Sequence, residues 1–282
     1  SRHKMISSGL KAGTQDVFIG IDSGSTTTKI VVLDEDSRLL YSYYNINGGN
    51  PIKAVEEGLN QLNDECLKQN AVLNIKGSCS TGYGEDLIRS AFQLHSGIIE
   101  TIAHYMAAHY LNKDVSFILD IGGQDIKAIS IDENGAVKNF LMNDKCAAGT
   151  GRFLEMMART LGLSLEEMST MGLEWKENIV ISSMCTVFAE SEVVSLVAQN
   201  KAVSDIIHGL NMSVASKVGA LAARLGQDNP GEYMMTGGVA KNKGITNALE
   251  EKLGAKLYIC DEAQLCGALG AALFAYEKCR EA

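Results

Sequence analysis

The sequence predicts an α/β protein made of two related lobes, and three observations support this class. Two stretches 98 residues apart (120 − 22) share one pattern: an apolar run ends on an acid, Asp22 or Asp120, and a polar loop and a second apolar run follow. Beyond each copy, segments with helical spacing of apolar residues alternate with short apolar runs, as expected where helices cover sheets. The 282 residues, 46% hydrophobic and 21% charged, are sufficient for two lobes.

Local signals along the chain predict the individual elements. Each copy of the shared pattern predicts a strand, a tight loop and a second strand. Asn50 and Pro51 are typical of a helix start, with Asn as the N-cap and Pro at the first position. We expect strand–loop–strand units over 17–34 and 116–132, and further strands near 72–79, 232–235 and 256–260. We expect helices over 98–112 and 203–225, and others that begin at about 147, 186 and 264.

The two loops have the composition of phosphate-binding loops. Glycine lets the backbone approach a ligand, and free amide groups in such turns point at phosphate oxygens. A single loop of this kind is more often an ordinary turn, but a second copy and Thr236-Gly-Gly238 after a later strand favour nucleotide binding. With a carboxylate at each strand end, the pattern predicts a clamp on a nucleoside triphosphate and its Mg²⁺. Neither a Walker loop nor a Rossmann fingerprint is present.

Composition excludes several classes of protein. A net charge of −9 without a basic stripe argues against nucleic-acid binding. No apolar run is long enough for a transmembrane helix, and the first residues do not resemble a signal peptide. Seven cysteines, an odd number, argue against a disulfide framework and predict a reducing, cytoplasmic location.

Two cysteines differ from the other five in their setting. At Cys146 and at Cys185, a segment of polar or small residues leads into apolar residues at helical spacing. A helix N-terminus favours the thiolate, which is the form that iron–sulfur clusters and soft metals require. Two thiolates per chain are too few for a four-iron cluster, whereas a two-fold dimer supplies four. By position alone, burial in the core is the more common role for such cysteines.

The loops and the cysteine segments together resemble a known superfamily, that of acetate and sugar kinases, Hsp70 and actin. Asp22–Lys29 and Asp120–Asp125 are similar to its two phosphate loops, and Thr236–Asn242 to its adenosine loop. Asn143–Glu155 and Ser182–Glu192 closely resemble one branch. This branch comprises the activators of 2-hydroxyacyl-CoA dehydratases, the ATPase subunits of benzoyl-CoA reductases and the reductases of double-cubane cluster proteins.

The resemblance implies a fold and a domain division. The fold is the actin-like (ribonuclease H-like) duplicated fold, with two lobes around a nucleotide cleft. Lobe I is expected to comprise residues 17–113 plus 265–282, and lobe II residues 114–264 with the cluster-ligand helices. Residues 1–16 are expected to be a tail, a tag or a linker.

The resemblance also implies roles for individual residues. Asp22 and Asp120 are expected to orient Mg²⁺, and Gln124 or Asp125 to position the attacking water. The residues expected to bind the nucleotide are Gly24, Ser25, Thr26, Thr27, Lys29, Gly122, Gly123, Gly237, Gly238, Val239, Asn242 and Gln264. Cys146 and Cys185 of both subunits of a homodimer are expected to ligate one shared [4Fe–4S] cluster.

The function implied is that of an ATP-hydrolysing iron–sulfur reductase that delivers low-potential electrons to a partner enzyme. Its cofactors would be ATP/ADP, Mg²⁺ and one [4Fe–4S] cluster per homodimer. A ferredoxin or flavodoxin would be the donor, and a 2-hydroxyacyl-CoA dehydratase, a benzoyl-CoA reductase-like enzyme or a double-cubane cluster protein the acceptor. Two alternatives remain at this point. One is a small-molecule kinase of the same fold acting on an amino sugar, with Asp120 or Asp125 as base, and the other is a nucleotide-dependent binding module.

Overall fold

The computed structural model describes residues 2–5, 7–132, 134, 136–143, 148–182, 185–225 and 232–282. The chain forms two compact units. Unit I comprises Lys4–Lys113 and Gln264–Ala282, and unit II comprises Ser1–His3 and Asp114–Ala263. No helix in the described part of the chain is both long and apolar enough to cross a bilayer.

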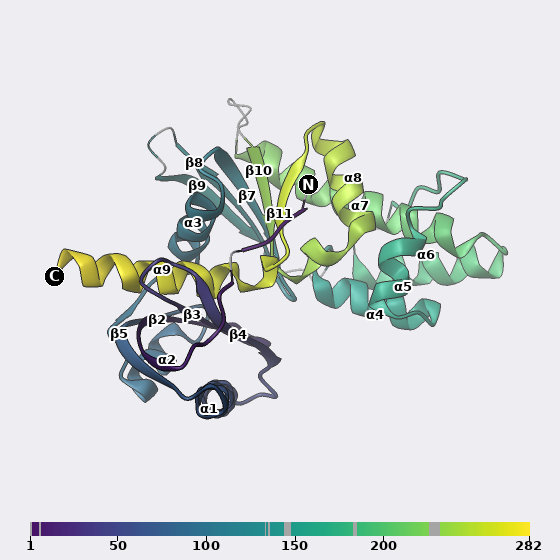
Figure 1. The fold of residues 1–282 in the computed structure, drawn as a ribbon. Helices are drawn as coiled ribbons and strands as arrows, with labels where there is room; N and C mark the ends of the chain where they lie inside the picture. Colours follow the sequence, from purple (N-terminus) through teal and green to yellow (C-terminus); the bar gives the residue numbers. More distant parts are fainter. Residues whose placement is uncertain are drawn as a thin grey trace. The chain divides into compact units, whose positions relative to one another are not determined.

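A five-stranded sheet forms the centre of unit I, with the strand order β4-β3-β2-β5-β6 (Figure 1). Strands β2, β3 and β4 are antiparallel in turn, whereas β5 runs parallel to β2 and β6 parallel to β5. The elements of this unit are β2 (Gly13–Ser23), β3 (Thr27–Leu33), β4 (Leu39–Ile46), α1 (Pro51–Gln69), β5 (Ala71–Thr81), α2 (Glu85–Phe92), β6 (Ser96–Gly97), α3 (Glu100–Leu111) and α9 (Cys266–Glu281).

Strand β2 alternates its side chains between two helical layers. Ile19 and Ile21 belong to the core cluster shared with α1, whereas Phe18 belongs to the cluster shared with α3 and α9. At Gly20 a side chain would lie 2.0 Å from the carbonyl oxygen of Ala268, so glycine is required for α9 to rest on the backbone of β2. This close packing brings the first turn of α9 to the carboxyl end of β2.

Unit II repeats the sheet of unit I. Its strands follow the order β9-β8-β7-β10-β11, with the same pattern of antiparallel and parallel neighbours, and the two-residue strand β1 pairs with β11 at the edge. The strands are β1 (Arg2–His3), β7 (Val115–Ile121), β8 (Ile126–Ile131), β9 (Val137–Asn143), β10 (Glu232–Thr236) and β11 (Leu257–Cys260). The duplication predicted from the sequence is therefore present in the strand topology.

The helices of unit II pack around α7, the longest of those described. They are α4 (Gly151–Leu161), α5 (Leu165–Met171), α6 (Thr186–Ala198), α7 (Val203–Arg224) and α8 (Lys243–Leu253), with short 3₁₀ helices η1 (Gly238–Lys241) and η2 (Ala263–Leu265) (Figure 1). The buried face of α7, which includes Ile206, Leu210 and Val214, lies in the main hydrophobic core of the unit.

Helix α7 also anchors the segment that leads to α6. The Asp205 carboxylate accepts hydrogen bonds from the amides of Lys176 (2.7 Å) and Glu177 (3.1 Å), and these bonds lower the pKa of Asp205. Trp175 stacks on His208 with ring centroids 3.9 Å apart and an interplanar angle of 6°. These contacts hold the chain against α7 a few residues before Cys185.

Several expected elements are confirmed. Asn50 is the N-cap of α1, its side-chain oxygen accepts from the amide of Lys53 at 3.1 Å, and Pro51 is the first helical residue. Both expected strand–loop–strand units are present, as are the helices and strands predicted after residue 186. Two helices, α2 and α5, were not expected, because each is too short for apolar spacing to reveal it.

Two element boundaries differ from the expected ones. Helix α4 begins at Gly151 instead of near 147, because Gly149 has a φ of 88° and Thr150 is extended, and neither conformation is helical. Strand β2 begins at Gly13 instead of near 17, because its first residues continue the parallel ladder with β5.

Candidate functional site

The first of the two expected phosphate loops is the turn between β2 and β3. Asp22 and Lys29 face each other across this hairpin, and Lys29 Nζ lies 3.3 Å from Asp22 Oδ2. The amide of Gly24 donates to the carbonyl oxygen of Thr27 at 2.8 Å, and Lys29 Nζ donates to Thr27 Oγ1 at 2.9 Å. The lysine is buried, so its charge is held inside the loop and not in solvent.

The second phosphate loop, between β7 and β8, repeats this geometry. Asp120 and Lys127 are partners across the hairpin, with Lys127 Nζ 3.8 Å from Asp120 Oδ2. The amide of Gly122 donates to the carbonyl oxygen of Asp125 at 3.0 Å. The side chain of Asp125 occupies the place that Thr27 has in the first loop, and it accepts from Lys127 Nζ at 2.7 Å. The shared sequence pattern thus encodes one local structure, built twice.

The loop residues expected to bind phosphate differ in exposure. Backbone amides and hydroxyls in tight loops can bind an anion only where solvent can reach them. Ser25 and Gly123 are exposed, and the residues of intermediate exposure are Gly24, Thr26, Thr27, Gly122, Gln124 and Asp125. The middle of each loop is therefore open to a ligand, while its lysine is enclosed.

Backbone hydrogen bonds join the second phosphate loop to helix α4. The amides of Gly151 and Arg152 donate to the carbonyl oxygens of Gly122 and Gly123 at 2.9 and 3.0 Å. Two of the first amides of α4 are thus satisfied by the loop itself. The start of α4, the helix that follows Cys146 in the chain, is thus bonded directly to this loop.

Asn47, directly after β4, braces the first phosphate loop and was not recognised from the sequence. Its Oδ1 accepts from Thr28 Oγ1, and its Nδ2 donates to the carbonyl oxygen of Gly24 at 2.7 Å. Its amide donates to the carbonyl oxygen of Thr26 at 2.9 Å. A lone asparagine between a strand and a helix has the composition of an ordinary turn, so no local signal distinguishes it.

The adenosine loop is tied to the end of β7. Thr236 Oγ1 donates to Asp120 Oδ1 at 2.8 Å. Gly237 has a φ of 89°, and a side chain there would lie 2.3 Å from the carbonyl oxygen of Ile121. Only glycine fits this conformation and this distance. At Gly238, by contrast, the space where a side chain would stand is open.

Other expected nucleotide contacts have structural roles as well. The side-chain oxygen of Asn242 caps α8 by accepting from the amide of Ile245 at 3.1 Å. Val239 is buried in the core of unit II, and Gln264 lies half-buried in η2. Gly237 is itself bonded at both backbone groups, since its amide donates to the carbonyl oxygen of Ala263 and its carbonyl oxygen accepts from the amide of Ala240. Gly238, with open space at its Cβ position, is therefore the more accessible of the two glycines.

The surroundings of Asp22 fit a hydrated divalent cation. Asp22 is buried, and its Oδ1 has no hydrogen-bond partner in the described part of the chain. The hydroxyls of Ser23 and Thr81, at the ends of the neighbouring strands β2 and β5, are also buried and lack partners there. Buried oxygens without donors are costly. Mg²⁺ and its bound waters would satisfy such a set.

The cysteines fall into two groups. Cys185 is exposed and forms the N-cap of α6, whereas Cys146 lies outside the described residues. Burial raises the pKa of the Cys79 thiol to about 11 and that of Cys260 to about 12. Cys66 and Cys266 are buried as well. These four cysteines pack in the core, as expected.

Helix α6 carries an exposed apolar surface directly after Cys185. We call it the α6 patch, and it consists of Val187, Phe188, Val194 and Val197. Phe188 is 68% exposed and Val187 66% exposed. Residues 187, 194 and 197 recur at helical spacing and lie on one side of the helix. Large apolar side chains grouped in this way are typical of an interaction surface.

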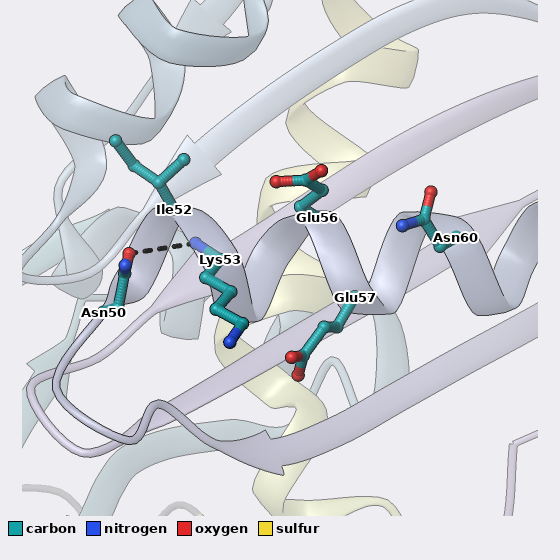
Figure 2. A pocket seen from close by; sticks show the side chains of 6 residues that line it. All are labelled: Asn50, Ile52, Lys53, Glu56, Glu57 and Asn60. Carbon is teal, nitrogen blue, oxygen red and sulfur yellow. Dashed lines mark hydrogen bonds between the residues drawn. The ribbon is translucent and has the colours of Figure 1, made fainter.

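A further hollow, of about 570 Å³, lies along helix α1 (Figure 2). Its lining comes from α1 and its N-cap alone, and consists of Asn50, Ile52, Lys53, Glu56, Glu57 and Asn60. Figure 2 shows the cap bond between Asn50 and Lys53, with Glu56 and Asn60 on one side of the helix and Glu57 on the other. None of these residues belongs to a phosphate loop or to the cysteine segments.

Together, two units of the same strand topology, each with a phosphate loop, define an actin-like ATPase, and comparisons with known proteins agree. Residues 19–275 match the BadF/BadG/BcrA/BcrD ATPase family, and the chain belongs to this family. It is 40% identical over 263 residues to the (R)-2-hydroxyglutaryl-CoA dehydratase activating ATPase of Acidaminococcus fermentans, covering 92% of this chain and 97% of that protein.

Two further relatives extend the comparison. One component of the benzoyl-CoA reductase of Thauera aromatica is 33% identical over 276 residues, with 93% of this chain and 95% of that protein covered. The activator of the 2-hydroxyisocaproyl-CoA dehydratase from Clostridium difficile, solved with bound ADPNP, is 36% identical with a TM-score of 0.84. That match covers 94% of this chain and 96% of the other. The expected family and duplicated fold are confirmed.

Proposed function

We propose that this protein is an ATPase that delivers low-potential electrons to a partner metalloenzyme. The observation that carries the proposal is the pair of matched phosphate loops, of which the second is hydrogen-bonded to the helix that follows Cys146. The named relatives, an activating ATPase and a reductase component, support the same activity. The partner is a 2-hydroxyacyl-CoA dehydratase, a benzoyl-CoA reductase-like enzyme or a double-cubane cluster protein.

In this proposal the phosphate loops bind Mg-ATP. Ser25, Thr26 and Thr27 bind the phosphates from unit I with amides and hydroxyls, and Lys29 supplies positive charge. In unit II, Gly122 and Gly123 bind phosphate, and Gln124 or Asp125 orients the attacking water. Asp22 and Asp120 hold the waters of Mg²⁺, and Gly237 and Gly238 leave room for the nucleoside.

A homodimer supplies the electron-transfer centre. Cys146 and Cys185 of both subunits together would hold one shared [4Fe–4S] cluster, which supplies one-electron transfer when bound. The exposed position of Cys185 at the N-terminus of α6 fits a ligand shared between subunits. The α6 patch beside it supplies apolar surface that association would bury. The six described cysteines are free, which fits the reducing cytoplasm that we propose, with a ferredoxin or flavodoxin as donor.

Hydrolysis acts on this centre through the backbone. ATP and ADP differ in the phosphate that the second loop contacts, so the two nucleotides favour different positions of Gly122 and Gly123. The amides of Gly151 and Arg152 follow these glycines, because they donate to the glycine carbonyls. The start of α4 therefore responds to the nucleotide bound.

Paired cysteine variants test this proposal. Cys185→Ala, purified without oxygen and reconstituted with iron and sulfide, should lose bound iron and electron delivery but still bind Mg-ADP. Cys279→Ala, at a half-buried position of α9, is the matched control and should retain iron and activity. Asp22→Ala should show the opposite result: it should bind the normal amount of iron but no longer hydrolyse ATP. Full iron content in Cys185→Ala would refute the cluster assignment.

A further inference from the structure

The carboxylate of Asp22 lies between two glycines that come from distant parts of the chain. An ideal side chain at Gly82, just after β5, would lie 2.5 Å from Asp22 Oδ1. One at Gly267, in the first turn of α9, would lie 2.3 Å from Asp22 Oδ2 and 3.0 Å from Asp22 Cγ. Real side chains essentially never approach other atoms this closely, so a side chain at either position would displace the carboxylate.

The environment of the two oxygens differs. Oδ2 lies near Lys29 Nζ, at 3.3 Å, and beside the N-terminal turn of α9, where the helix dipole favours negative charge. Oδ1 is buried and has no partner in the described part of the chain. One oxygen is therefore anchored, and the other is left without a hydrogen-bond donor among the described residues.

From this arrangement we propose that Gly267 and Gly82 are positioning residues, which set the orientation of the Asp22 carboxylate toward the nucleotide-bound cation. The inference rests on the proposed function and assigns to it two residues outside the phosphate loops. Gly267 acts through Oδ2, since any side chain there must rotate or shift the carboxylate. Gly82 acts through Oδ1.

Gly267 is the better of the two positions for a test. Its φ lies outside the left-handed region, so alanine is compatible with the helix, and the atoms that alanine would meet belong to the Asp22 side chain. Gly82 has a φ of 94°, and a side chain there would also lie 2.5 Å from the carbonyl oxygen of Ser23. Gly82→Ala would therefore strain the backbone and disturb more than the carboxylate.

The control is Gly219→Ala in α7. It makes the same change within a helix, and the nearest atom to the new methyl group is Lys252 Cγ at 3.2 Å, part of a flexible side chain. Equilibrium binding of ADP is measured for each full-length variant, with Mg²⁺ and with EDTA. Gly267→Ala should weaken Mg-ADP binding about 10-fold or more, the scale for residues that orient a metal ligand. Binding in EDTA should stay within about twofold, and Gly219→Ala should match the wild type in both conditions.

A double-mutant cycle separates positioning from general damage. In an Asp22→Ala background, Gly267→Ala should have no further effect on Mg-ADP binding, because the carboxylate that it displaces is absent. If Gly267→Ala alone folds poorly, the same double variant should regain the thermal stability of Asp22→Ala. An equal loss in both backgrounds, an equal loss in EDTA, or no loss at all would overturn the inference. Failure of the wild type to bind Mg-ADP would instead refute the proposed function.

Discussion

Removal of the Asn47 side chain should loosen the first phosphate loop and destabilise the protein. Asn47→Ala deletes the bond from Thr28 Oγ1 and the 2.7 Å bond to the carbonyl oxygen of Gly24. Thr28 is fully buried, so its hydroxyl would be left without a partner, at a cost of about 1–3 kcal/mol, and a lost hydrogen bond adds about 1 kcal/mol. We expect the free energy of unfolding to fall by roughly 2–4 kcal/mol, as measured by urea denaturation.

Two companion variants make this reasoning refutable. Asn45→Ala, two residues earlier, exposed and within β4, should change stability by about 0.5 kcal/mol or less. Thr28→Val removes the hydroxyl, so the double variant Asn47→Ala/Thr28→Val should recover part of the loss. If Asn47→Ala is no less stable than Asn45→Ala, or if Thr28→Val adds its own full cost to that of Asn47→Ala, the brace is not formed as described.

Three further predictions follow from burial and backbone geometry. Burial lowers the pKa of His208 below its usual 6.5, so the unfolded chain takes up a proton that the folded imidazole resists. The melting temperature should therefore fall as the pH drops below about 6.5. In His208→Gln this fall should be smaller, and an unchanged dependence of the melting temperature on pH would contradict the burial of His208. Gly237→Ala should destabilise the protein by about 2 kcal/mol or more, whereas Gly238→Ala, with open space, should cost about 1 kcal/mol or less in the same denaturation assay. In the folded, iron-free protein at about pH 8, iodoacetamide should label exposed Cys185 and spare buried Cys260, as read by mass spectrometry; equal labelling would show that Cys260 is not buried as described.

The sequence alone was sufficient for features that depend on neighbouring residues. Alternating apolar runs around a short glycine-containing loop specify a hairpin within about twenty residues, so the duplicated phosphate loops could be predicted from their spacing. The start of α1 was predictable for the same reason, since Asn50 and Pro51 act on the adjacent turn. The cysteine segments were found through family resemblance, because spacing alone did not distinguish Cys185 from a buried cysteine.

Tertiary structure decided how these local features become a site. Sequence spacing left the exposure of Lys29 and Lys127 open, and the structure shows both buried beside carboxylates. Thr236 reaches Asp120 across 116 positions of the chain, and Gly267 faces Asp22 only because α9 returns to pack on β2. Such contacts are set by the pairing of distant strands and the seating of a helix on a sheet, and no local pattern of residue types encodes them.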